Sequence, residues 1–164
     1  MLFGLQIVRV GTLAFVLWLG AWSSVGAQTE KPLVFILAGQ SNMVGQGVTA
    51  ELTADQLITP PNVTYLMETG ETGLFDRARF GPEVSLVPRL AQAWPDRELI
   101  FVKHAVGGTS LLAWAQEWDA ARAELTRNVE VGPLYTQLIA ILDRHELRGD
   151  AEIGAVFWMQ GESD

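Results

Sequence analysis

The chain has 164 residues, a formal net charge of −8 and no cysteine. This length fits one domain. The acidic balance argues against a nucleic-acid partner, because phosphate binding relies on Lys and Arg. Without cysteine, these residues form no disulfide, no thiol nucleophile and no thiolate metal site.

Residues 1–27 have the pattern of a secretory signal peptide. Residues 10–22 form an apolar run that is short for a membrane span, and Val25 to Ala27 supply the small residues of a cleavage site. The alternative is an uncleaved N-terminal anchor, which the short run disfavours. We therefore expect a secreted or periplasmic protein, no stable membrane insertion after cleavage, and a domain over residues 28–164.

The predicted elements alternate between strands and helices along the chain. Residues 33–38 are six apolar residues in succession, which is typical of a strand buried on both faces of a parallel sheet. After it we expect, in order, a short helix over 50–57, a strand over 63–67 and a loop over 68–81.

The second half continues this alternation. Residues 82–94 predict a helix, with Pro82 in the first turn, although Pro88 allows a later start. The remaining expected elements are a strand over 98–103, a helix over 111–127, a helix over 133–147 that Gly149 ends, and a strand over 153–158.

Strand–helix alternation predicts a parallel sheet with helices on both faces. We expect a flavodoxin-like three-layer α/β/α sandwich with the strand order 2-1-3-4-5. In that order the fourth strand would be a bare apolar edge without a neighbour. The last strand and helix of the domain are therefore expected beyond residue 164.

Glycine-containing polar loops follow the first, third and fourth predicted strands. The carboxyl ends of parallel strands share one edge of the sheet, so Ser41, Gly108 and the segment 160–164 should converge there. Each feature has an ordinary explanation when taken alone. Ser41 could be a helix N-cap, Gly107 and Gly108 a tight turn, and Gln160 a buried amide bonded to backbone. Their shared edge favours a functional site.

Three motifs lie in these loops: Gly-Gln-Ser-Asn-Met at 39–43, Ala-Val-Gly-Gly-Thr-Ser at 105–110 and Trp-Met-Gln-Gly-Glu-Ser-Asp at 158–164. Together they resemble the SGNH hydrolase superfamily, and within it the branch of sialate O-acetylesterases and acetyl xylan esterases. The first is similar to the GQSNM nucleophile motif of that branch, the second to its second block, and the third to its WxQGES(D/N) block. A lipase-type G-x-S-x-G motif is not present, because position 43 is Met. This argues against the α/β-hydrolase fold.

The resemblance implies an esterase that removes O-acetyl groups from carbohydrates without a metal or other cofactor. Ser41 would attack the acyl carbonyl, and the backbone N–H groups of Ser41 and Gly108 would stabilise the oxyanion. Gln160 is the favoured side-chain donor to that oxyanion, with Ser163 as the alternative. Glu162 would orient a histidine or hold its loop. The residues expected to contact the acetylated carbohydrate are Gln40, Asn42, Gly107 and Thr109.

The general base is the part of this site that the sequence does not supply. The family places it in a late D-x-x-H motif, and these residues contain none. His145 is expected at the opposite edge of the sheet. His104 is expected at the correct edge, but similar rhamnogalacturonan acetylesterases use a later histidine. We therefore expect the base beyond Asp164 and the esterase domain to be incomplete at its C-terminus.

Two other function classes remain to be compared with an esterase. A non-catalytic module could bind acetylated glycans through the same three loops. A nucleotide or phosphate binder on a doubly wound sheet is opposed by the lack of G-x-x-x-x-G-K and G-x-G-x-x-G patterns. The oligomeric state has no signal in the sequence.

Overall fold

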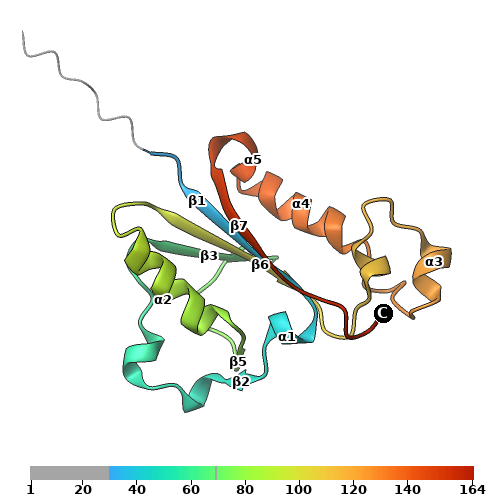
Figure 1. The fold of residues 1–164 in the computed structure, drawn as a ribbon, viewed down its shortest axis with the longest axis horizontal. Coiled ribbons are helices and arrows are strands. Elements are labelled where there is room, and N and C mark those ends of the chain that lie inside the picture. Colours follow the sequence, from blue (N-terminus) through green and yellow to red (C-terminus); the bar gives the residue numbers. More distant parts are fainter. Residues whose placement is uncertain (1–29, 69) are drawn as a thin grey trace, which may run out of the picture.

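The computed structural model of the protein describes residues 30–68 and 70–164, so the expected signal peptide at residues 1–27 lies outside the described residues. The described part folds around one sheet, with helix α2 (Glu83–Ala93) on one face and helix α4 (Leu134–Arg144) on the other (Figure 1). The expected α/β class with a parallel sheet is confirmed, and so is the helix expected over 82–94. The helix expected over 133–147 ends earlier, at Arg144, because Glu146 takes a left-handed conformation with a φ of +55°, so Gly149 does not end it.

Five strands form the sheet in the order β4-β3-β6-β1-β7. Strands β3, β6, β1 and β7 are parallel, and β4 pairs antiparallel with β3. The bounds of the strands are β1 Leu33–Gly39, β3 Val63–Met67, β4 Gly70–Glu71, β6 Leu99–Ala105 and β7 Glu152–Met159.

The strand order differs from the expected flavodoxin-like order. When the four predicted strands are numbered along the chain, the sheet runs 2-3-1-4 and not 2-1-3-4. All seven residues of β1 and six of the seven residues of β6 are buried, which explains why both strands are central. An apolar pattern identifies a central strand, but it does not specify which neighbour lies on which side. The sequence therefore could not distinguish the two orders.

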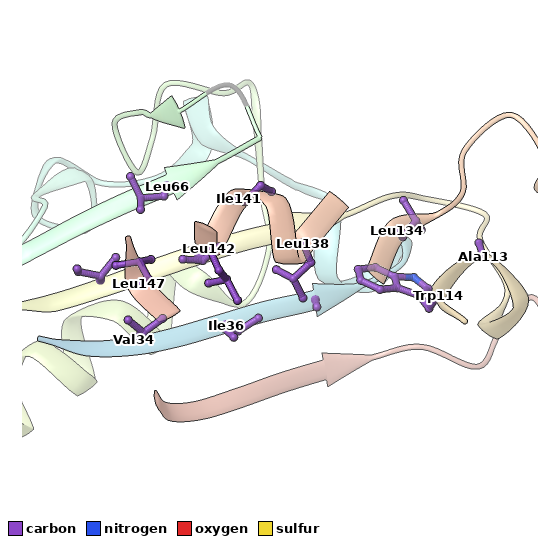
Figure 2. Close-up of a cluster of buried hydrophobic side chains, with 13 residues drawn as sticks. Val34, Ile36, Leu66, Ala113, Trp114, Leu134, Leu138, Ile141, Leu142 and Leu147 are labelled. Carbon is purple, nitrogen blue, oxygen red and sulfur yellow. The ribbon is translucent and has the colours of Figure 1, made fainter. Parts of the chain in front are cut away.

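The sheet divides the apolar core into two halves. Val34 and Ile36 of β1 face α4, whereas Phe35 faces α2. Figure 2 shows the α4 half, in which Leu138 and Ile141 of the helix lie against the sheet. This packing on both faces gives the carboxyl ends of β1 and β6 a rigid support.

Two expected helices are wrong. The segment 50–57 forms two 3-10 turns, η1 (Thr49–Glu51) and η2 (Ala54–Leu57). A new turn starts at Thr53 because its backbone N–H donates to the Gln56 side chain at 3.0 Å. The segment 111–127 is also broken, into η3 (Leu111–Trp114) and α3 (Ala120–Glu124). Helix α3 begins where Asp119 accepts the Ala121 N–H at 2.8 Å.

The remaining short elements connect the main ones. Segment 68–81, expected as a loop, contributes the small strands β4 and β5. Strand β5 pairs antiparallel with β2 in a separate two-stranded sheet. The bounds of these elements are α1 Ser41–Val44, β2 Gly47–Val48, β5 Arg79–Phe80 and α5 Leu147–Asp150.

Strand β7 lies at the edge of the sheet and keeps much apolar surface exposed. Val156 is 56% exposed and Trp158 is 44% exposed, beside the groove between β7 and α4. Within residues 30–68 and 70–164, no helix has the length and hydropathy that a membrane span requires.

Gly39 ends β1 at a point of close approach to β7. Its φ is +142°, and a Cβ at this position would lie 2.0 Å from the carbonyl oxygen of Met159. Only glycine allows the two strands to come this close in that backbone conformation. The β1–β7 pairing at the carboxyl edge therefore depends on this residue.

We predict that Gly39→Ala destabilises the protein more than Gly149→Ala does. Gly149 also has a positive φ, of +102°, but a Cβ there meets nothing within 4 Å. Both substitutions strain the backbone, and only the first adds a backbone clash, so its free energy of unfolding should fall by about 2 kcal/mol more. Urea unfolding followed by tryptophan fluorescence measures both values. If both variants lose the same free energy of unfolding, β1 and β7 can move apart at position 39 without loss of stability.

Candidate active site

The register of the sheet brings the three polar loops to one edge. Gly39 pairs with Ala105 of β6 and with Met159 of β7, so the three strands end at the same level. The backbone bonds continue into the loops: Gln40 donates its N–H to Met159 O at 2.9 Å, and Val106 donates to Gly39 O at 3.1 Å. The expected convergence of these loops at the carboxyl edge is confirmed.

Ser41 is the first residue of α1, a helix of one turn directly after β1. Gln40 occupies the N-cap position, so Ser41 is not the cap of this helix. The Ser41 residue is half-buried, whereas Met43 two residues later is fully buried in the core on the α2 face. Met43 thus attaches α1 to the core while the serine remains accessible.

The second loop passes directly beside Ser41. A Cβ on Gly107 would lie 3.6 Å from the Ser41 Cβ, which is an ordinary van der Waals contact. Gly108 is exposed and has a φ of +72°. Its left-handed conformation favours glycine, and it leaves the backbone open to a ligand at this point.

Asn128 holds this loop, and the sequence analysis did not identify it. Its Oδ1 accepts the Ser110 N–H at 2.8 Å, and its Nδ2 donates to Gly108 O at 3.3 Å. The side chain is buried and comes from the segment after α3. No local motif marks Asn128, because its role depends on a contact with residues 18 and 20 positions earlier.

The third loop is joined to the first by a carboxylate. Glu162 accepts hydrogen bonds from the side-chain amides of Gln40 and Asn42. These bonds, that of Gln40 first, lower the pKa of Glu162 below its usual value. Ser163 Oγ adds a bond to Gln40 Oε1 at 3.2 Å. Of the two roles expected for Glu162, the structure shows the one that holds the loop.

Gln160 joins the third loop to the second. Its Nε2 donates to Thr109 O at 2.6 Å, so the amide plane is fixed. An amide nitrogen carries two hydrogens, and one remains after this bond. Gln160 Oε1 is buried and has no partner within the described residues.

Gln40 and Thr109 are placed differently from the substrate contacts expected of them. Gln40 is 1% exposed and Thr109 is 0% exposed. Gln40 bonds to the third loop, and Thr109 Oγ1 donates to Val106 O at 2.8 Å. Both side chains therefore position the loops, while Asn42 and Gly107 are exposed at the site.

The two histidines occupy opposite ends of the sheet. His145 follows α4, on the side where β7 begins, as expected. His104 lies near the carboxyl end of β6 but is buried against Trp114, with ring centroids 5.5 Å apart. Burial lowers the pKa of His104, and the charge of Glu68 opposes that shift. His104 Nε2 has no hydrogen-bond partner in the described part of the chain.

A cavity of about 350 Å³ opens beside these loops, at the carboxyl ends of β3 and β6. Its lining includes Glu68, Asp76 and Arg77, together with Ala105 and Val106 of the second loop. Among residues 30–68 and 70–164, no three His, Asp or Glu side chains gather as a metal site requires.

Comparison with known families gives a match over nearly all of the described chain. Residues 31–164 match the family model for carbohydrate esterase, sialic acid-specific acetylesterase. No curated protein matches the sequence at a significant level.

Three solved structures share the fold. A protein from Arabidopsis thaliana has a TM-score of 0.61 and 20% identity, over 82% of this chain and 59% of its own. A carbohydrate acetylesterase from Xanthomonas citri has a TM-score of 0.51 and 19% identity, over 79% and 33%. NanS has a TM-score of 0.52 and 15% identity, over 82% and 55%. This chain thus spans between one third and three fifths of their lengths.

We predict that acid releases the amides of Gln40 and Asn42 from Glu162. Because the folded pKa of Glu162 is depressed, the contact is complete above its usual value of 4.5 and is lost as the pH falls through the lower folded value. The side-chain amide signals of both residues should shift in that range in ¹H–¹⁵N NMR spectra. Glu162→Gln should remove the titration, and Glu51→Gln, at an exposed site in η1, should leave it. A titration that survives in Glu162→Gln contradicts the assignment.

Proposed function

Because the chain belongs to the carbohydrate esterase family of sialic acid-specific acetylesterases, we propose that it removes O-acetyl groups from carbohydrates with Ser41 as the nucleophile. One observation carries the proposal: the loops of Ser41, Gly107 and Glu162 meet at one sheet edge and bond to one another. Ester cleavage needs a serine, oxyanion donors and a fixed geometry between them.

The proposed reaction follows the chemistry of serine esterases. Ser41 Oγ attacks the acetyl carbonyl carbon and forms a tetrahedral oxyanion. The N–H groups of Ser41 and Gly108 and the remaining Gln160 N–H donate to that oxyanion. The C–O bond to the sugar then breaks, and the sugar oxygen takes the proton that the general base received from the Ser41 hydroxyl. Water attacks the acetyl-enzyme in the same way, which releases acetate and restores Ser41.

The general base is a further part of the proposal, because neither histidine of the described chain is placed to take the Ser41 proton. A base must lie within hydrogen-bond reach of the Ser41 hydroxyl. His145 lies at the other end of the sheet, and His104 is buried against Trp114. We expect the base in a D-x-x-H motif encoded after Asp164, with His104 as the alternative.

The substrate class follows from the family, and the compartment follows from residues 1–27. Acetylated sialates and acetylated xylan-type sugars are the proposed substrates. The proposed location is the periplasm or the cell exterior, where such glycans are accessible. The Xanthomonas citri relative is itself described as a carbohydrate acetylesterase.

We predict that Ser41→Ala abolishes acetyl ester hydrolysis by the full product of the gene. Loss of the nucleophile should lower kcat by a factor of about 10⁴ or more. The assay measures acetate release from p-nitrophenyl acetate and from acetylated xylan or sialate. Ser85→Ala, the same substitution at an exposed serine of α2 outside the three loops, is the control and should keep its activity.

The same assay separates the alternatives. The 164-residue chain should be slower than the full product by about 10²–10⁴-fold if the base lies beyond Asp164. Equal rates that both disappear in His104→Ala would make His104 the base. A Ser41→Ala protein that still binds acetylated glycan, with no hydrolysis by the parent, would favour the non-catalytic module.

A further inference from the structure

A buried ion pair lies behind the Ser41 loop and belongs to none of the contacts described above. Lys103 Nζ lies 2.6 Å from Glu83 Oε1, and the two residues are 2% and 3% exposed. Lys103 comes from β6, and Glu83 is the first residue of α2. The pair therefore connects the sheet to the helix that covers it.

Lys103 also reaches the helix that carries Ser41. Its Nζ donates to Val44 O at 3.0 Å, and Val44 is the last residue of α1. On the other side of the pair, Glu83 Oε1 accepts the Gly81 N–H at 2.9 Å. One ammonium group thus ties together the sheet, the end of α1 and the start of α2.

Helix α1 needs support of this kind because it is short. It has four residues, and no side chain caps its N-terminus. A single helical turn is not stable by itself, since nucleation fixes several residues for one hydrogen bond. Met43 gives α1 an apolar contact, but such contacts are not directional. The bond from Lys103 is directional and originates in the most buried part of the sheet.

Stability alone is a weak reason for an ion pair at this position. Removing both charges from water costs several kcal/mol per ion, and well-packed apolar residues often replace buried pairs without loss. Burial lowers the pKa of Lys103, and the charge and hydrogen bond of Glu83 oppose that shift. An apolar pair would fill the space, but it could not donate a bond to Val44 O.

We propose that Lys103 is a positioning residue for the Ser41 nucleophile, acting through its hydrogen bond to Val44 O, with Glu83 holding the lysine in place. This inference rests on the proposed function of Ser41. Lys103 contributes to the lining of the cavity at the carboxyl ends of β3 and β6, and the hydrogen bonds of its ammonium group go to Glu83 and to Val44 O. It acts on the orientation of the turn that presents the hydroxyl.

The test compares two variants that share Gln at position 83. Glu83→Gln removes the negative charge but leaves an oxygen that accepts from Lys103 and Gly81. The double variant K103M/E83Q also removes the donor to Val44 O and keeps a side chain of similar length. The comparison therefore removes the donor to Val44 O in a background from which the carboxylate is already absent.

We predict that K103M/E83Q lowers kcat about 10–100-fold relative to E83Q and changes KM less than twofold. A misplacement of about 1 Å costs on the order of 10²-fold when a reacting group is displaced. The assay uses the full gene product and p-nitrophenyl acetate, and a fluorophosphonate probe measures the labelling rate of Ser41 independently. Labelling should slow in parallel with kcat.

Two controls separate positioning from general destabilisation. R148M/D143N removes an exposed ion pair of 3.1 Å at the far end of α4 and α5, and it should keep the parent kcat. Ile141→Val lowers the melting temperature through the core on the α4 face, and it should also leave kcat unchanged. If K103M/E83Q does not fold, K103Q/E83Q replaces it. This variant keeps two polar side chains, but Gln at position 103 is shorter than Lys and should not reach Val44 O, so the same loss of kcat is expected.

The outcomes are distinct. A folded double variant with kcat and labelling within twofold of E83Q overturns the positioning role, while Ser41→Ala can still confirm the proposed function. If Ser41→Ala keeps full hydrolysis, the proposed function fails and the positioning role fails with it. A loss of kcat equal to that of a similarly destabilised Ile141→Val protein also overturns the positioning role.

Discussion

The close approach of β1 and β7 at Gly39 determines the geometry of the whole site. The backbone of Gly39 pairs with Ala105 on one side and with Met159 on the other, and the position leaves no room for a side chain. Each of the three loops leaves the sheet directly after this row of residues. A change in the register of β7 by one residue would turn its side chains to the other face and move the third loop away from Ser41.

Polar bonds then fix the loops relative to one another. Glu162 joins the third loop to the first, Gln160 joins it to the second, and Asn128 holds the second from behind. All of these partners are far apart in the sequence, so the bonds form only when the sheet is complete. The loops are therefore held in fixed positions before any substrate arrives, which is the preorganisation that the proposed oxyanion donors would need.

The sequence was sufficient to predict those strands and helices that a local pattern of apolar residues marks. The apolar run at 33–38 and the helical period at 133–147 identified β1 and α4, and the loops after three strands pointed to one edge. The strand order was not accessible, because burial on both faces says nothing about which strand is the neighbour. The helix expected over 111–127 failed because Asp119 starts a new helix inside it.

The site residues divide in the same way. The sequence motifs pointed to Ser41 and to Gly107 and Gly108 as candidate site residues. They did not show which motif residues are exposed at the site and which, like Thr109, bond to the backbone of their own loop. Lys103 did carry a signal, since it is a charged residue that directly follows the four apolar residues at the start of β6. A lysine in such a place requires a partner, and only the fold shows that the partner is Glu83.

The shared carboxylate of Glu162 has a consequence for how such sequences can change over time. Two amides, from Gln40 and Asn42, each donate to a different oxygen of this one side chain. A substitution at position 162 leaves both amides without their acceptor, and one at position 40 also frees Ser163. The first and third motifs are therefore expected to co-vary as a unit in evolution, so that a lineage altering one must soon alter the other or lose both.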